Sequence, residues 1–358
     1  MLCYNALMSR SKMLYKLPQG TERLLLEDAL RRQRVVRLVQ DTFQLWGYGP
    51  VQTPVIDFYD LYAPFMPGDD VYRLVDREGE LLMLRSDITL FLARSAGTTL
   101  REGHTPLRLC YADTILRHQD AQDISENEFF QVGAEFIGSL APDGDLEMLL
   151  LLDDILERLG LEAQIHLGSR AVFDQVVNLE GLQNESDKLA LQKEVLFRRP
   201  GVLKGDLKEL FAFVGTAREA RALLSRLKLS SSVQKAAEDL VTLAETLVPL
   251  ALKDRFRVDF SEIGQREYYT GLVFQAYLAG VGDAFAAGGR YDSLLGRFGL
   301  ASPSVGFSLS VRKIEPYTTV QVSGAEAVVA PGATWQERLT WARRERAAGR
   351  VVTLGGSV

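Results

Sequence analysis

Apolar and polar side chains partly alternate in the stretch from Leu107 to Gly138, LRLCYADTILRHQDAQDISENEFFQVGAEFIG. Alternation with a period of two is typical of a strand that has one face on a core. We therefore predict two strands, Leu107–Leu116 and Phe129–Ile137, joined by a polar loop into a long antiparallel hairpin. The second strand has an apolar row at Phe130, Val132, Ala134 and Phe136 and a polar row at Gln131, Gly133 and Glu135.

This hairpin has two interpretations. Arg117 and His118 stand where the first strand enters the loop, and the polar row of the second strand ends in the carboxylate of Glu135. A cation at a loop mouth beside such a row indicates a pocket for a small zwitterionic ligand. A solvated amphipathic hairpin is the alternative, and on this stretch alone it is the more common case.

Before this hairpin, the pattern predicts a helix and a shorter hairpin. Apolar residues recur at a period near 3.6 from Glu27 to Trp46, and Gly47 follows, so we expect a helix over Glu27–Trp46. Two short apolar runs, Val71–Val75 and Leu81–Leu84, flank a charged turn that contains Gly79. They predict a pair of antiparallel strands.

A proline and a helix cap add two local expectations. Val51–Ile56 has the composition of a strand but contains Pro54. Because proline cannot donate to a ladder, this strand should lie at a sheet edge or a subunit interface. Ser86 or Asp87 is the expected N-cap of a helix that runs to about Ala96, since short oxygen side chains accept hydrogen bonds from free amides in a first turn.

The second half of the chain changes character at about residue 171, where strand signals vanish until residue 252. We predict an all-helical insertion with breaks at Pro200-Gly201, Gly215 and Leu229–Ser232. The elements expected around it are helix Leu146–Leu159, strands Ala163–Leu167, Arg257–Phe260, Leu272–Tyr277, Asp283–Ala286 and Ser304–Leu309, a turn at Gly288–Tyr291, and helices Asp292–Arg297 and Ser310–Glu315.

The C-terminal residues predict one strand–helix–strand unit. Its parts are Ala327–Ala330, Trp335–Ala348 and Val351–Leu354. Two strands are too few to bury both faces of a sheet. We therefore expect this unit to dock on something else or to be a truncated remnant of a larger domain.

Composition narrows the class of protein. The 358 residues are 47% hydrophobic and 25% charged, typical of a globular protein, and the net charge of −6 gives no global sign of a nucleic-acid surface. Cys3 and Cys110 form no metal or disulfide pattern, which makes a reducing cytoplasm the default. The three histidines are too scattered in sequence for a zinc site, and no apolar run reaches the ~20 residues of a membrane span. The first residues lack the apolar core of a signal peptide, and we interpret them as a frayed leader.

Four separated stretches place polar groups at strand ends or loop mouths, namely Arg85–Thr89, Arg117–Glu135, Glu262–Gly271 and Gly288–Tyr291. In a mostly antiparallel sheet they could converge on one concave face, where small ligands usually bind. The same stretches carry a family resemblance. In order, LPQGTERLLL, WGYGPVQTPVID, LMLRSDITLFLAR, LCYADTILRHQD with ENEFFQVGAEFIG, YYTGLVFQAY, AGGRYDSLL and SVGFSLSVRKI resemble the core of histidyl-tRNA synthetase and its relatives.

The resemblance covers roughly residues 17–170 and 255–316 and implies a fold. It is the α+β fold of class II aminoacyl-tRNA synthetases, a mostly antiparallel sheet flanked by helices. Members are usually dimers, and Trp46–Asp57 resembles the dimer-interface motif. The expected domains are a discontinuous core at residues 1–170 and 255–320, a helical insertion at 171–254, and a truncated C-terminal βαβ unit at 321–358.

The resemblance also implies a histidine pocket. Asp87 and Thr89 resemble the pair that binds the amino group of histidine, with Asp87 in place of the family glutamate, and Gln131 resembles the glutamine that reaches the same ammonium. Glu135 and Tyr269 resemble the pair that holds the imidazole, and Tyr268 lines the pocket. This chemistry is consistent, because a carboxylate and a phenol can satisfy both imidazole nitrogens.

The residues for activating an amino acid are less complete. Adenylate formation needs cations around the α-phosphate. Arg117 resembles the arginine at that position and is retained in the pocket. Four other family positions differ: Gln119 replaces a glutamate, Phe130 a histidine, Gly264 an arginine, and Arg312-Lys313 a Glu-Arg pair. Together these losses argue against adenylation.

Plain structural roles compete with these assignments. Asp87 can act as a helix cap as well, Glu135 could be a solvated strand residue, and Tyr268 could serve packing alone. Arg117 could pair with Glu126 or Glu128. Gly288-Gly289 is better explained by a turn than by a phosphate cradle.

Three functional hypotheses follow. The first is a regulatory subunit of ATP phosphoribosyltransferase, a non-catalytic relative of the synthetase that partners the short-form catalytic subunit, dimerises, and mediates feedback inhibition by histidine. It implies no cofactor, no metal and no nucleic acid. The second is an active histidyl-tRNA synthetase or another amino-acid-activating enzyme. The third is a stand-alone histidine sensor with a different partner.

Overall fold

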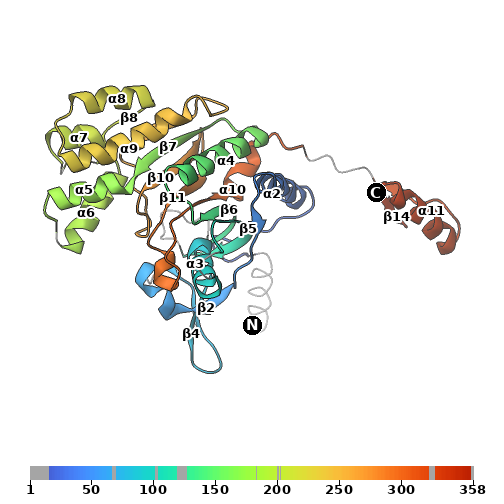
Figure 1. The fold of residues 1–358 in the computed structure, drawn as a ribbon. Helices are drawn as coiled ribbons and strands as arrows, with labels where there is room; N and C mark the ends of the chain where they lie inside the picture. The colour runs from blue at the N-terminus through green and yellow to red at the C-terminus, as the bar shows by residue number, and fades with distance from the viewer. Residues whose placement is uncertain are drawn as a thin grey trace, which may run out of the picture. The chain divides into compact units, whose positions relative to one another are not determined.

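The computed structural model describes residues 16–66, 70–100, 104–118, 127–182, 184–199, 201, 203–321 and 327–355. Two compact units make up the chain (Figure 1). One comprises the residues up to Arg23 together with Val35–Thr319, and the other comprises Leu24–Arg34 together with the residues from Val320 onwards. The expected leader and Gln119 lie outside the described residues.

A nine-stranded sheet forms the core of the first unit. Its neighbouring strands pair antiparallel except for β1 with β5 and β7 with β9. The predicted mostly antiparallel sheet is confirmed. In spatial order the strands are β1 (Gly49–Pro50), β5 (Leu107–Leu116), β6 (Glu128–Ile137), β12 (Ser304–Ser310), β11 (Ala286–Arg290), β10 (Leu272–Leu278), β7 (Ala163–Ser169), β9 (Phe256–Asp259) and β8 (Val214–Gly215).

The predicted long hairpin lies in the interior of this sheet. β5 and β6 pair from Leu107 opposite Ile137 to Leu116 opposite Glu128, and β12 pairs with the other side of β6. Every residue from 132 to 137 is buried, and Glu135 is only 1% exposed. The interpretation as a solvated amphipathic hairpin is therefore wrong, because both faces of β6 are covered.

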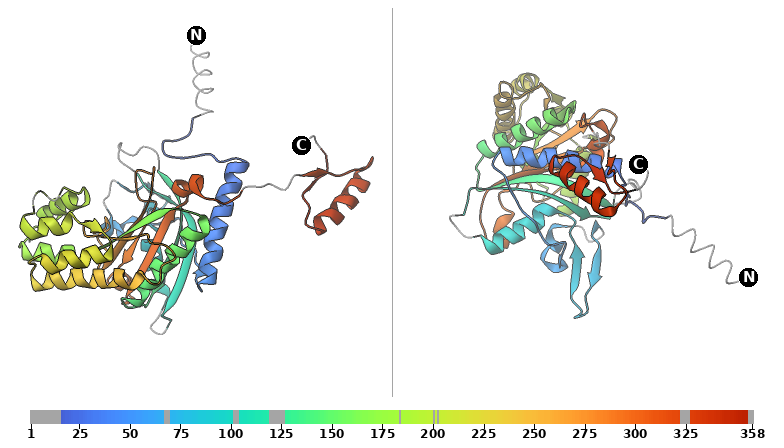
Figure 2. Two further views of the ribbon diagram at one scale, coloured as in Figure 1. Left: turned by 90° about the horizontal axis from the view of Figure 1, so that it is seen from above. Right: turned by 90° about the vertical axis from the view of Figure 1, so that its right-hand side faces the viewer.

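Helices cover opposite faces of the sheet at β6, as Figures 1 and 2 show for α3 (Ile88–Thr99) and α4 (Asp143–Leu159). α4 packs on β6 and β12, and its Asp145 Oδ1 lies 2.7 Å from Arg290 Nη2. α3 approaches the other face, where Thr89 Oγ1 donates to Glu135 Oε1. The predicted helix Leu146–Leu159 is thus confirmed with an earlier start.

The N-terminal half follows its local signals except at one segment. α2 spans Glu27–Leu45 and α3 has Asp87 as its N-cap, as predicted. The expected strand Val51–Ile56 is wrong: β1 ends at Pro50, and β2 (Ile56–Phe58) belongs to a separate sheet of order β2-β4-β3, with β3 at Arg73–Val75 and β4 at Leu81–Leu84. Pro54 lies in neither strand, and β1 and β2 each end the order of their own sheet.

In the described part of the segment between β7 and β9, α-helices alternate with one short strand. The helices are α5 (Arg170–Leu179), α6 (Glu185–Leu196), α7 (Gly205–Phe211), α8 (Ala217–Arg226) and α9 (Ser231–Leu247), in green to yellow in Figure 1. The description as all-helical is wrong in one place, because Val214 and Gly215 form β8 against β9. The capping box of Thr216 and Glu219 starts α8 immediately afterwards.

The predictions for residues 283–297 are also wrong. The expected strand Asp283–Ala286 and the expected turn Gly288–Tyr291 are replaced by β11 (Ala286–Arg290) inside the sheet. Gly288 serves close packing, because a Cβ there would lie 2.5 Å from side-chain atoms of Phe274 and Phe307. In place of a helix at Asp292–Arg297 the structure has the 3-10 helix η5 (Leu295–Phe298). β12 then leads into α10 (Val311–Ile314), as expected.

The second unit contains the predicted strand–helix–strand element. β13 (Val328–Val329) and β14 (Val352–Thr353) pair parallel, and α11 (Trp335–Ala347) connects them. Thr334 caps α11, and the buried residues of this unit include Ala330, Ala342 and Val352. Across the described parts of both units, no helix combines the length and apolar character that crossing a membrane requires.

We expect Gly288→Ala to lower the free energy of unfolding by about 1–3 kcal/mol or more, because the added methyl group overpacks the sheet. Gly282→Ala is the matched control, since a Cβ at Gly282 meets nothing within 4 Å. It should change stability by about 0.5 kcal/mol at most. Urea unfolding followed by circular dichroism measures both. Equal stability of the two variants would contradict the packing role of Gly288.

Candidate functional site

The four polar stretches converge as predicted, on the α3 face of the sheet. The N-terminus of α3 supplies Asp87 and Thr89, β6 supplies Glu135, and the loop from Phe260 to Gly271 supplies Tyr268 and Tyr269. Tyr291 follows β11 and lies beside Glu135. Hydrogen bonds link these elements, so the site is a connected polar cluster.

Glu135 is the deepest group of the cluster. Its carboxylate accepts hydrogen bonds from Thr89 Oγ1 at 2.7 Å and from the Tyr291 hydroxyl, and Tyr111 OH lies 3.5 Å away. The carboxylate occupies the space above Gly306, where a Cβ would lie 1.6 Å from Glu135 Oε2. A glycine on the neighbouring strand is therefore required for Glu135 to lie flat on the sheet.

Burial raises the pKa of Glu135 to about 7, although hydrogen bonds from Tyr291 and Thr89 act in the opposite direction. The charged and neutral forms are therefore both accessible near neutral pH. A neutral or charged imidazole could find a matching partner here, since a protonated carboxyl donates and a carboxylate only accepts.

Asp87 has a structural and a pocket-facing role at once. Its Oδ1 accepts a hydrogen bond from the Leu90 amide at 3.1 Å, which is the N-cap bond of α3. Its Oδ2 accepts from Tyr268 OH at 3.3 Å and lies 3.5 Å from Arg266 Nε. The cap thus fixes the carboxylate while its other oxygen faces Tyr268 and Arg266.

Arg117 points into the same cluster. Its Nη2 donates to the Ser86 carbonyl at 2.8 Å, and its guanidinium stands 5.9 Å from the centre of the Phe129 ring. The alternative considered for Arg117 was an ion pair with Glu126 or Glu128. Among the described residues Arg117 bonds to Ser86 and forms no ion pair with Glu128, and Glu126 lies outside the described residues. The Arg117 Nε atom is buried without a hydrogen-bond partner among them. Burial, with the charge of Arg266, lowers the pKa of Arg117 to about 10.

The two tyrosines precede β10 instead of lying on a strand. Their ring centres are 5.1 Å apart, and the Tyr268 ring meets the Tyr291 ring edge-on at 5.9 Å. Tyr269 fits between two glycines, since a Cβ would lie 2.6 Å from its ring at Gly264 and 2.7 Å from it at Gly289. Burial, followed by the charge of Asp87, raises the pKa of Tyr269, so its hydroxyl stays protonated.

Gln131 lies on the same face of β6 as Glu135, because the two positions differ by an even number along one strand. It is half-buried and stands opposite Asp113 on β5 and Ser310 on β12. The predicted contact of Gln131 with an ammonium group rests on this shared face alone. Among the described contacts, none links Gln131 to Asp87.

Three residues of the cluster were not among the predicted site residues, although two of them, Arg266 and Tyr291, lie in stretches that were expected to converge. Tyr111 and Tyr291 reach Glu135, and Arg266 reaches Asp87. The register of the hairpin could have identified Tyr111, which lies opposite Gly133. For Arg266 the available signal was its position two residues after Gly264, in the loop where a cation had been expected.

Of the other altered family positions, Arg312 and Lys313 interact with residues outside this cluster, while Gly264 lies against Tyr269. Arg312 Nε is 3.4 Å from Glu22 Oε2, and Lys313 Nζ donates to the Ala284 carbonyl at 3.3 Å. Gly264 has φ +76 and no room for a side chain. The groups expected to bind ATP are thus absent or engaged elsewhere at these positions.

A second polar cluster lies beside β7, β9 and β10. His166, Asp259 and Glu262 bring ligand atoms within 4.8 Å of one another. Arg198 Nη2 already lies 2.5 Å from Asp259 Oδ2 and 3.4 Å from Glu262 Oε1, and Tyr277 OH donates to Glu262 at 2.6 Å. The arginine supplies the positive charge that a metal ion would bring, so this set favours a salt-bridged cluster.

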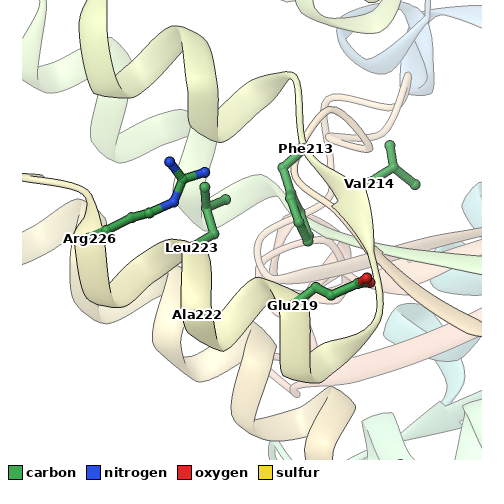
Figure 3. Close-up of a pocket in the computed structure, with 6 residues that line it drawn as sticks. All are labelled: Phe213, Val214, Glu219, Ala222, Leu223 and Arg226. Carbon is green, nitrogen blue, oxygen red and sulfur yellow. The ribbon is translucent and has the colours of Figure 1, made fainter.

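One further hollow lies between β8 and α8 (Figure 3). Its lining residues are Phe213, Val214, Glu219, Ala222, Leu223 and Arg226. None of the residues predicted for the histidine pocket lines it.

Comparison with known families places this geometry in context. The family model for histidyl-tRNA synthetase matches residues 20–314. A protein from Moorella thermoacetica named ATP phosphoribosyltransferase regulatory subunit is 30% identical over 358 residues, covering 95% of this chain and 92% of the relative. A protein of the same name from Geobacter metallireducens is 31% identical, covering 82% of this chain and 72% of the relative.

Two solved structures are similar. One, from Bacillus halodurans, is described as an ATP phosphoribosyltransferase regulatory subunit/histidyl-tRNA synthetase, with a TM-score of 0.82 at 24% identity, covering 96% of this chain and 94% of that one. The other, from Alicyclobacillus acidocaldarius, is described as a histidine–tRNA ligase subunit, with a TM-score of 0.70 at 28% identity, covering 84% and 96%. The predicted class II synthetase fold is confirmed.

We expect Glu135 to make the stability of the protein depend on pH. Its pKa in the folded chain, about 7, exceeds its ordinary value of 4.5, so the folded state binds more protons between these values. The stabilisation is complete below pH 4.5 and is lost as the pH rises through about 7. The loss is of the order of 3 kcal/mol.

The Glu135→Gln side chain cannot ionise, so this variant should lack the pH-dependent part of the stability that Glu135 contributes. Urea unfolding at pH 5 and pH 8 should show that the wild-type chain loses more stability between the two values than the variant does. Glu180→Gln alters an exposed carboxylate at the end of α5 and is the control. An unchanged pH dependence in the Glu135 variant would contradict the raised pKa.

Proposed function

We propose that this chain, which belongs to the family of ATP phosphoribosyltransferase regulatory subunits within the histidyl-tRNA synthetase group, is the histidine-responsive subunit of an ATP phosphoribosyltransferase complex. It would enable the short-form catalytic subunit to join ATP and phosphoribosyl pyrophosphate. It would also carry feedback inhibition by histidine. We propose that it acts in the cytoplasm.

The observation that carries the proposal is the composition of the pocket. Asp87 offers an acceptor for an ammonium group, and Glu135 with Tyr269 offers partners for an imidazole. Polar groups that have no water around them need such partners. The cluster therefore suits free histidine as its ligand, and Thr89, Arg117, Gln131 and Tyr268 complete the proposed set.

Loss of the activating groups supports a regulatory role over an enzymatic one. A glycine with no space for a side chain stands at position 264, and Arg312 and Lys313 interact with Glu22, Ala284 and Asp283. Only interactions that are stronger in the transition state than in the ground state accelerate a chemical step. We therefore propose that the chain has no adenylation activity of its own, and no cofactor or metal.

A dimer is proposed from the apolar surface of the small β2-β4-β3 sheet. Exposed apolar side chains gather on this sheet and beside it, and two of them, Val55 and Ile56, belong to the stretch Trp46–Asp57 that resembles the dimer-interface motif. Large exposed apolar groups close together mark interaction surfaces. They are Val55, Ile56, Phe58, Leu61, Val75 and Leu81.

The proposed domain division keeps the expected boundaries: a core at 1–170 and 255–320, an insertion at 171–254, and a C-terminal unit at 321–358.

Feedback inhibition in a complex with the catalytic subunit requires linkage between histidine binding and the state of the complex. Histidine can inhibit the catalytic subunit only if it binds one state of the complex more tightly than another.

Mixing experiments test this function. The short-form catalytic subunit from the same source should form phosphoribosyl-ATP only after this chain is added, and the activity should fall as histidine is titrated in. Unchanged activity of the catalytic subunit would contradict the proposal and would favour a histidine sensor with a different partner. Histidine-dependent exchange between ATP and pyrophosphate by this chain alone would favour the synthetase.

A variant of the pocket separates assembly from regulation. We expect Glu135→Ala to weaken histidine inhibition about 10-fold or more, because the imidazole loses a buried partner. Assembly with the catalytic subunit should persist on size-exclusion chromatography, and Glu180→Ala should behave as wild type. Full histidine sensitivity in Glu135→Ala would show that the pocket is assigned wrongly.

A further inference from the structure

The loop before β10 supplies a second cation to the pocket. Arg266 Nε lies 3.5 Å from Asp87 Oδ2, and the two side chains are 20% and 8% exposed. Burial acts to lower the pKa of Arg266, but Asp87 and the adjacent tyrosines more than offset it, so the pKa is raised. Arg266 is therefore charged and paired in the unliganded pocket.

The carboxylate of this pair is fixed in position. Asp87 Oδ1 is held by the Leu90 amide, and its Oδ2 also accepts from Tyr268 OH. Arg117 stands close enough for its charge to act on the same groups, as does Asp70. The cluster thus presents the fixed Asp87 carboxylate paired with Arg266, with the charges of Arg117 and Asp70 nearby.

We infer that Arg266 is a specificity-determining residue that binds the α-carboxylate of the ligand; the inference rests on the proposed binding of histidine. In an α-amino acid the ammonium nitrogen and the carboxyl carbon are about 2.5 Å apart, since two bonds of about 1.5 Å separate them. The Asp87–Arg266 pair presents its opposite charges 3.5 Å apart. A zwitterion laid against this pair meets each charge with its opposite, its ammonium on Asp87 and its carboxylate on Arg266.

The position of the cation follows from the backbone of the loop. Gly264 has φ +76, and a Cβ there would press on the Tyr269 ring at 2.6 Å, so the loop cannot carry an arginine at that position. Two residues later the chain has turned back toward α3, and Arg266 reaches Asp87. The charge is thus supplied from a new position, next to the ammonium site.

This arrangement selects an amino acid over the corresponding amine. Histamine has the imidazole and the ammonium of histidine but no carboxylate. Its ammonium competes with Arg266 for Asp87 and gives the guanidinium no anion in return. Without Arg266 that competition ends, and the carboxylate of histidine loses its partner.

Isothermal titration of the full chain with L-histidine and with histamine tests the inference. The wild-type chain should prefer histidine by about 10-fold or more. Arg266→Gln should weaken histidine binding by about 10- to 100-fold, as expected for a charge-assisted hydrogen bond, with histamine binding unchanged or tighter. Arg266→Lys keeps the charge and should keep part of the preference.

Arg257→Gln is the matched control. The Arg257 side chain is also 20% exposed and pairs with an aspartate, Asp254, but it lies on β9, away from Asp87. The Arg257→Gln variant should prefer histidine over histamine as strongly as the wild type does. The role of Arg266 is overturned if Arg266→Gln prefers histidine over histamine as strongly as the wild type does. It is also overturned if the variant binds both ligands more weakly by the same factor. A wild-type chain that binds neither ligand overturns the proposed histidine site itself, so the two failures are distinct.

Discussion

The burial of one carboxylate, Glu135, is the constraint on which the pocket depends. Removing an ion from water costs several kcal/mol, on the order of the total stability of a domain, unless hydrogen bonds compensate. The hydroxyls of Thr89, Tyr111 and Tyr291 meet this need in part, and each belongs to a different part of the chain. The position of α3, the register of β5 on β6 and the exit of β11 are therefore coupled to one side chain. Gly306 completes the arrangement, because any larger residue would occupy the space of the carboxylate.

The opposite face of the same strands is held by ion pairs. Arg290 on β11 binds Asp145 on α4 at 2.7 Å, and Arg108 on β5 binds Glu147 on the same helix at 2.7 Å. The Arg290–Asp145 pair is buried, and breaking a buried pair is far more destabilising than breaking a more exposed one such as Arg108–Glu147. The sheet under the pocket is thus fixed from behind, so a ligand can be recognised by side chains that move little. A preorganised floor of this kind keeps the cost of binding low.

The structure also explains how a synthetase-like core can serve regulation. In the proposed function, the amino acid would be recognised by groups in the floor of the cluster and at the start of α3, among them Glu135 and Asp87. Activation depends on cations placed for a phosphate, and in this chain Arg312 and Lys313 interact elsewhere while Arg266 faces Asp87. When ligand binding does not serve a transition state, its free energy can instead favour one assembly state over another. The same pocket can therefore act as a sensor after a small number of side-chain changes.

The sequence by itself determined the elements whose causes are local. Alternation predicted the hairpin, Asp87 was recognisable as a cap, and the strand–helix–strand unit at the C-terminus followed its own pattern. Motifs in order then indicated the fold and most of the pocket. The prediction was wrong at Gly288, because glycine is common both in turns and where a sheet leaves no room for a side chain. Gly288 was expected in a turn but lies inside the sheet, packed against Phe274 and Phe307. It was also wrong for the two-residue strand β8, whose existence depends on its partner β9. Only the tertiary structure decided that Arg266 meets Asp87 and that three hydroxyls meet Glu135. Such contacts join residues as far apart as Asp87 and Tyr268, which are 181 positions apart, and no local pattern records which distant side chain will fill a given space.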